Sequence, residues 1–132
     1  MVKKILTKKK NNFLKFSNLY KIKANKIIKF LLATKRGQLI IFIEGEGLYI
    51  YDSGSFLELL RIPTETDIVD LAEDASGLLY ILKNTMVKII QFNNDYSNYV
   101  LVNKIIFQSF DKVNFINISS NGTIIISRAK KN

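Results

Sequence analysis

One stretch of the sequence decides the fold: residues 68–82, which read Ile68-Val69-Asp70-Leu71-Ala72-Glu73-Asp74-Ala75-Ser76-Gly77-Leu78-Leu79-Tyr80-Ile81-Leu82. Two apolar runs flank a cluster of Asp, Ser and Gly, which are turn-forming residues, so the stretch predicts a strand, a tight turn and a second strand. We expect Gly77 to adopt a positive φ, where a residue without a Cβ has no steric penalty, and Asp74 to cap the turn through its carboxylate.

The same pattern occurs three times along the chain. The copies align on Gly37, Gly77 and Gly122, which are 40 and 45 residues apart. Branched aliphatic residues lie nine and six positions before each glycine, and apolar runs follow it. The aligned aliphatic residues are Ile28, Ile68 and Val113 at the first position and Leu31, Leu71 and Ile116 at the second. A period of about 40–45 residues that contains strands is typical of propeller blades, whose inner strands are apolar on both faces.

These signals predict an all-β fold, a β-propeller-like array of antiparallel four-stranded blades. The first blade is expected at residues 26–33, 38–43, 47–52 and 56–62, and the second at 67–73, 78–83, 86–92 and 98–105. A half blade is expected at 113–118 and 123–127, and two N-terminal strands within residues 13–23 are candidates to complete it. We therefore expect residues 1–12 to form a flexible basic arm and residues 13–132 to form one domain.

The second copy resembles the repeat of the two-component regulator propellers. The residues that carry the resemblance are Ile68, Leu71, Glu73, Asp74, Gly77, Leu79, Tyr80 and Ile81. In the first copy, Gly45-Glu46-Gly47-Leu48-Tyr49-Ile50-Tyr51-Asp52 is similar to the segment that follows in that family, and WD-repeat blades are a comparable match. The chain departs from the family in having Tyr80 in place of Trp and Asn84-Thr85-Met86 in place of a glycine-rich turn. The resemblance implies blades and, as one alternative, ligand sensing.

Basic charge is concentrated at the start of the chain. Residues 1–36 contain twelve Lys or Arg and no acidic residue, whereas residues 37–100 contain three basic and ten acidic residues. Such an asymmetry favours a polyanionic partner, although a block of lysines is also typical of a solubilising tail. The predicted nucleic-acid-binding residues are Lys3, Lys4, Lys8, Lys9, Lys10, Lys15, Lys21, Lys23, Lys35 and Arg36.

Composition excludes several chemistries. The chain contains no cysteine and no histidine, so Ser-His-Asp and Cys-His catalysis and zinc sites with His or thiolate ligands are excluded. We interpret Gly37, Asp74, Gly77 and Gly122 as structural turn residues, and we predict no catalytic residue, no metal and no cofactor. No apolar run is long enough for a transmembrane helix, and no secretory signal is expected. A cytoplasmic location is expected, and organelle targeting by the basic N-terminus stays open.

The sequence therefore predicts a non-catalytic interaction or scaffold module. The leading hypothesis is an accessory subunit whose basic end contacts RNA or a ribonucleoprotein assembly. The alternatives are a ligand-sensing propeller fragment and a protein-only assembly factor. Because two and a half blades leave strand edges to be covered, a protein partner or a homodimer is also expected.

Overall fold

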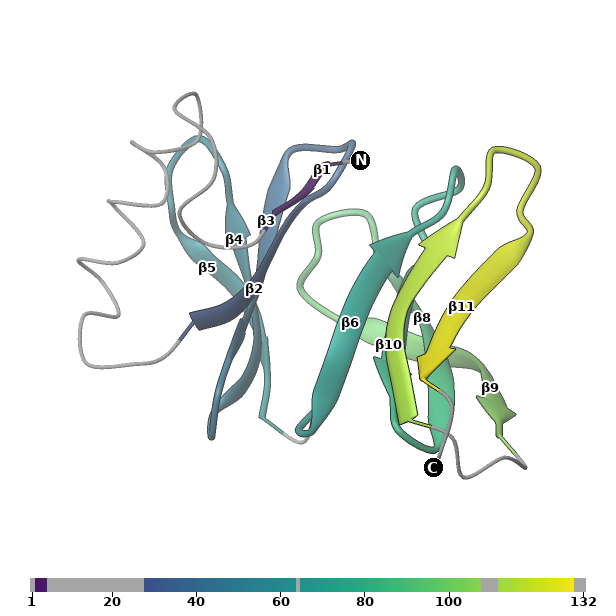
Figure 1. Cartoon of the computed structure of the whole chain (residues 1–132). Helices are drawn as coiled ribbons and strands as arrows, with labels where there is room; N and C mark the ends of the chain where they lie inside the picture. Colours follow the sequence, from purple (N-terminus) through teal and green to yellow (C-terminus); the bar gives the residue numbers. More distant parts are fainter. Residues whose placement is uncertain (1, 5–27, 64, 108–111, 130–132) are drawn as a thin grey trace. The chain divides into compact units, whose positions relative to one another are not determined.

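The computed structural model describes residues 2–4, 28–63, 65–107 and 112–129 of the chain (Figure 1). The chain divides into two compact units, residues 1–66 and 67–132. The strands of the first unit are β1 (Val2–Lys4), β2 (Ile28–Ala33), β3 (Gln38–Ile43), β4 (Gly47–Asp52) and β5 (Glu58–Ile62). Those of the second are β6 (Ile68–Glu73), β7 (Leu79–Lys83), β8 (Met86–Phe92), β9 (Tyr99–Ile106), β10 (Lys112–Ile118) and β11 (Ile124–Ala129).

The first unit contains one antiparallel sheet in the order β1-β2-β3-β4-β5. Two of its inner strands, β3 and β4, are apolar along nearly their whole length, and both of their faces are buried. One face carries a core cluster in which Ile41 and Tyr49 are directly opposite each other. Burial on both sides explains why these strands read as continuous apolar runs rather than as an alternating pattern.

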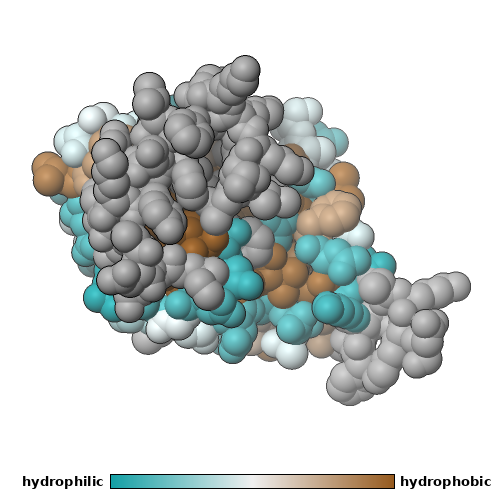
Figure 2. Space-filling view, turned by 60° about the vertical axis from the view of Figure 1, so that its left-hand side comes forward, coloured by the Kyte–Doolittle hydropathy of each residue, from teal (hydrophilic) through white to brown (hydrophobic). Residues whose placement is uncertain are grey.

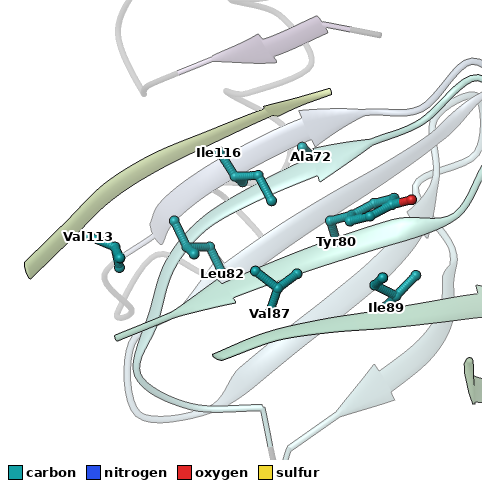
Figure 3. Close-up of a cluster of buried hydrophobic side chains, with 7 residues drawn as sticks. All are labelled: Ala72, Tyr80, Leu82, Val87, Ile89, Val113 and Ile116. Carbon is teal, nitrogen blue, oxygen red and sulfur yellow. The ribbon is translucent and has the colours of Figure 1, made fainter. Parts of the chain in front are cut away.

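The second unit combines a four-stranded antiparallel sheet, β6-β7-β8-β9, with the hairpin β10-β11. Apolar side chains of β6, β7, β8 and β10 form its core (Figure 3). These side chains are Ala72, Tyr80, Leu82, Val87, Ile89, Val113 and Ile116. A buried hydrogen bond also links β10 to β6, because the backbone N–H of Ile116 donates to Oδ2 of Asp70 at 3.0 Å. The hairpin is thus held on the sheet by apolar packing and by one carboxylate.

The three aligned turns share one hydrogen-bond pattern. In each turn, the backbone N–H of the residue three positions before the glycine donates to the carbonyl oxygen of the residue that follows the glycine, at 2.9, 3.1 and 2.9 Å in chain order. The backbone N–H of the glycine in turn donates to the carbonyl oxygen of the residue three positions before it, at 3.3, 3.1 and 3.0 Å. The side-chain oxygen three residues before the glycine accepts from the amide after it, at 3.0, 2.9 and 3.0 Å. The accepting residues are Thr34, Asp74 and Ser119. Gly37, Gly77 and Gly122 have φ values of +91°, +90° and +88°, so each position requires the conformational freedom of glycine.

The same three hairpins also share an irregularity in their pairing. The register shifts between Ile28 and Phe30 in β2, between Ile68 and Asp70 in β6 and between Val113 and Phe115 in β10. Each shift falls at the same distance before the aligned glycine. A β-bulge at a fixed place bends each first strand in a comparable way.

The structure confirms the all-β class and the antiparallel hairpins, and the strand bounds agree with the predicted ranges to within about two residues. Two observations bear on the predicted organisation of the chain. Within the predicted flexible arm, Val2–Lys4 form strand β1, because the free edge of β2 offers backbone hydrogen bonds that a short segment can take. The chain falls into two compact units, and the prediction of one domain over residues 13–132 stays a prediction. The strands predicted within residues 13–23 lie outside the described residues.

Candidate functional site

The basic end of the chain, residues 1–36, contains both β1 and β2, and the pairing of these two strands brings parts of it together. In the antiparallel pairing of β1 with β2, Val2 is opposite Ala33 and Lys3 is opposite Leu32. Strand β2 leads directly into the turn that contains Lys35 and Arg36, and both of these side chains are exposed. The pairing therefore places the backbone of Lys3 and Lys4 beside the strand that ends at this turn.

The structure describes only four of the ten predicted nucleic-acid-binding residues. Lys3 and Lys4 lie in β1, and Lys35 and Arg36 lie in the turn between β2 and β3. The other six, which lie outside the described residues, are Lys8, Lys9, Lys10, Lys15, Lys21 and Lys23. A further cation of the basic block, Lys29, forms an exposed ion pair with Glu44 at 3.8 Å, and such a pair contributes little to stability.

A second polar cluster joins the turn before β4 to β5. The Tyr49 hydroxyl donates to Oε1 of Glu46, and the Arg61 guanidinium lies 5.0 Å from the centre of the Tyr49 ring and 3.9 Å from Glu46 Oε1. The ring of Tyr51 stacks on that of Tyr49, with centroids 6.2 Å apart and planes 10° from parallel. Arg61 is directly opposite Tyr49 in the sheet, so the strand register alone positions this cation–π contact.

Burial dominates the electrostatics of the two tyrosines in this cluster. Burial, together with the hydrogen bond to Glu46, raises the pKa of Tyr49 to about 12. Burial also raises the pKa of Tyr51 well above its usual value. Both phenols therefore stay protonated at neutral pH, where they can donate a hydrogen bond but cannot act as a base or a nucleophile. Sequence reasoning missed this cluster, although Tyr49 and Tyr51 share a face by simple strand alternation.

The acidic residues of the turns serve local structure. Asp74 Oδ1 accepts from the backbone N–H of Ser76 and of Leu78, and Asp74 Oδ2 accepts from the Tyr80 hydroxyl. Burial by itself would raise the pKa of Asp74, but these hydrogen bonds and that of the Ser76 hydroxyl outweigh it and hold the pKa below its usual value. In the parts of the chain that the structure describes, no three His, Cys, Asp or Glu side chains are grouped as metal ligands would be.

A hollow of about 360 Å³ lies at the β8–β9 turn. Its lining is rich in side-chain amides and consists of Gln91, Phe92, Asn93, Asn94, Asn98, Tyr99 and Val100. Two of the amides are used by the turn itself, because Asn93 Oδ1 accepts from the Asn98 amide at 3.1 Å and Asn98 Oδ1 accepts from the Tyr99 amide at 2.8 Å. The run Asn93-Asn94-Asp95 is typical of a turn, and the sequence gives no separate indication of a hollow there.

Comparison with known proteins adds no relative: no family model, no curated protein and no solved structure matches this chain. Among the described residues, no helix is long and apolar enough to cross a membrane.

Proposed function

We propose that this chain is a propeller-like interaction module whose basic end contacts RNA. The observation that carries the proposal is the block of twelve Lys or Arg without an acidic residue in residues 1–36, while the following 64 residues hold ten acidic and three basic residues. The pairing of β1 with β2 supports it, because this pairing places two residues of the block beside the strand that ends at Lys35 and Arg36.

The expected binding mode is contact between cationic side chains and phosphates. Lysine and arginine bound to phosphates release counterions, so the affinity falls with salt, and phosphate contacts carry no base information. The module should therefore prefer RNA over neutral polymers and show little sequence preference. The repeated turns and bulges of β2-β3, β6-β7 and β10-β11 support the blade arrangement that such a scaffold would use.

The first prediction concerns the salt dependence of RNA binding. With about five phosphate contacts, a single-stranded RNA should give a log–log slope of affinity against salt near −3.5, measured by fluorescence anisotropy between about 50 and 200 mM salt. Replacing Lys8, Lys9 and Lys10 with Gln should flatten the slope by about 2. This triple variant is preferable to a deletion of residues 1–12, because Val2–Lys4 belong to the sheet.

A matched control removes the same charge elsewhere. Lys83→Gln, Lys88→Gln and Lys112→Gln, combined in one variant, lower the net charge equally but lie in the second unit. This control should keep the slope of the natural chain. If the slope of affinity against salt is equal for the natural chain and for the variant with Gln at positions 8, 9 and 10, these lysines do not contact RNA and serve only as a solubilising tail.

One observation favours a second candidate function, that of a protein-only assembly factor. Strand β9 exposes five large apolar side chains, which is more typical of a protein-binding edge than of a free surface. The two candidates differ in a simple measurement on the purified protein. Co-purified nucleic acid, seen as a raised ratio of absorbance at 260 nm to that at 280 nm, supports the RNA-binding function. A purified protein that carries no nucleic acid supports the assembly factor.

A further inference from the structure

Strand β9 is the most unusual surface of the described residues. It is the last strand of the sheet β6-β7-β8-β9 and pairs, among the described strands, only with β8. Every residue from Val100 to Ile106 is exposed. The exposed fractions of its large apolar side chains are 60% for Val100, 51% for Leu101, 49% for Val102, 37% for Ile105 and 66% for Ile106. Hydrophobic residues are also visible between hydrophilic ones on the face of the molecule drawn in Figure 2, in which β9 is not marked.

The corresponding strand of the first unit shows how an edge is normally protected. Strand β5 has five residues, and two of them, Glu58 and Arg61, are exposed charges of opposite sign. Strand β9 has eight residues and one charge, Lys104. Its other protective feature is a bulge, because Ile89 is opposite Asn103 while Ile90 is opposite Leu101, which leaves Val102 unmatched. Long, apolar edges with so little charge are templates for another strand.

We propose that β9 is a homodimer interface at which it pairs antiparallel with β9 of a second copy. A two-fold axis between Val102 and Asn103 makes the strand self-complementary, as an interface between identical surfaces requires. Tyr99 then faces Ile106 of the second copy, and Val100 faces Ile105. This inference does not depend on the basic end or on RNA.

Charge favours a second copy over a charged peptide. Strand β9 has no acidic residue, so no charge on it would favour a basic peptide. Its one lysine would favour an acidic peptide only weakly. In the two-fold register, Lys104 faces Leu101 of the other copy, and the two lysines are about 10 Å apart along the strands. The pairing therefore opposes no like charges directly, and it covers apolar side chains with apolar side chains.

The register gives a test with opposite outcomes at one position. Leu101→Lys places a lysine opposite Lys104 of the second copy, twice per dimer, whereas Leu101→Glu places a glutamate there. Light scattering at high micromolar concentration should find a dimer for the natural chain, at least about tenfold weaker association for Leu101→Lys, and a retained or strengthened dimer for Leu101→Glu.

A matched control uses an exposed apolar residue away from β9. Leu57 is 66% exposed, and Leu57→Lys should leave the dimer unchanged. Far-ultraviolet circular dichroism confirms folding, and Val100→Lys serves as a second weakening variant if Leu101→Lys does not fold. A monomeric natural chain would overturn the proposal, and so would equal dimerisation of Leu101→Lys and Leu101→Glu or loss of the dimer in Leu57→Lys.

Discussion

Two neighbouring glycines show how differently the same residue is used. Gly45 and Gly47 both have positive φ, at +81° and +106°. A Cβ added to Gly45 would meet no atom within 4 Å. A Cβ added to Gly47 would lie 2.8 Å from the Cα of Pro63 and closer still to the carbonyl oxygen of Ile62. Gly47 therefore permits the close approach of β4 to the end of β5, whereas Gly45 only permits a turn.

We predict that Gly47→Ala is much more destabilising than Gly45→Ala. The left-handed backbone should make Gly45→Ala cost about 1–2 kcal/mol in the free energy of unfolding. Gly47→Ala should cost about 1–3 kcal/mol more, because backbone atoms cannot move aside as a flexible side chain can. Urea denaturation of both variants measures the difference, and equal losses would show that the close approach is not tight.

Asp74 gives a prediction that depends on pH. Asp74→Ala removes the carboxylate that accepts from Ser76, Leu78 and Tyr80, so it should cost roughly 0.5–2 kcal/mol at neutral pH, as the loss of a capping side chain does. Because the pKa of Asp74 is lowered in the folded chain, this stabilisation is present above the ordinary Asp pKa of about 3.9 and is lost as the pH falls through the lowered value.

The measurement is a series of denaturant titrations from neutral to acid pH. The natural chain and Asp74→Ala should converge in stability as the pH falls. Asp95→Ala is a useful comparison, because Asp95 accepts from the hydroxyl and the amide of Ser97 at an exposed turn and its pKa is lowered by these hydrogen bonds as well, so it should show a smaller penalty with the same direction of pH dependence. An Asp74→Ala penalty that stays constant down to strongly acid pH would contradict the role given to the carboxylate.

At the scale of elements, the three hairpins explain why the sequence was so informative. The turns that contain Gly37, Gly77 and Gly122 are specified by local chemistry, since only glycine adopts the required φ without cost. Their flanking apolar runs then fix where the strands begin and end. The bulges were not predictable, because a register shift depends on how two strands pair and leaves no separate mark in the residue pattern.

The candidate site was less predictable than the strands. Charge counting identified Lys3 and Lys4 as well as Lys35 and Arg36, but it did not show that β1 pairs with β2, the strand that ends at Lys35 and Arg36. The cluster of Tyr49, Arg61 and Glu46 also depends on register between strands and on a turn. Sequence patterns report the period within one strand, whereas these contacts are set by which strand lies beside it.

The hairpin β10-β11 yields a prediction at the same scale. Asp70→Ala removes the buried acceptor of the Ile116 amide, so it should destabilise the docking of this hairpin by about 1.5–3 kcal/mol, the usual range for a hydrogen bond to a charged group. Hydrogen exchange of the Ile116 amide should accelerate accordingly. Asp70→Asn keeps an acceptor oxygen of similar size and should lose less, and an unchanged exchange rate in Asp70→Ala would rule out this link.

At the scale of the whole molecule, the chain combines two features of different character, one in its sequence and one in its structure. Its first 36 residues carry most of the basic charge, and β9 in the second unit carries the exposed apolar edge. Under the two proposals, a polyanion binds the former and β9 of a second copy binds the latter. A dimer would present two basic ends. The apparent affinity for RNA should therefore increase when one RNA molecule is long enough to contact both ends.

The most direct test of the central claim, that the basic end contacts RNA, is a titration of the ¹⁵N-labelled chain with a short single-stranded RNA, followed by amide chemical shifts at low salt. We predict that the largest shifts fall within residues 1–37, including Lys35 and Arg36, that they vanish at high salt, and that the amides of β6 to β11 stay nearly unchanged. Shifts concentrated at the β8–β9 turn, or no shifts in residues 1–37 at low salt, would contradict the account.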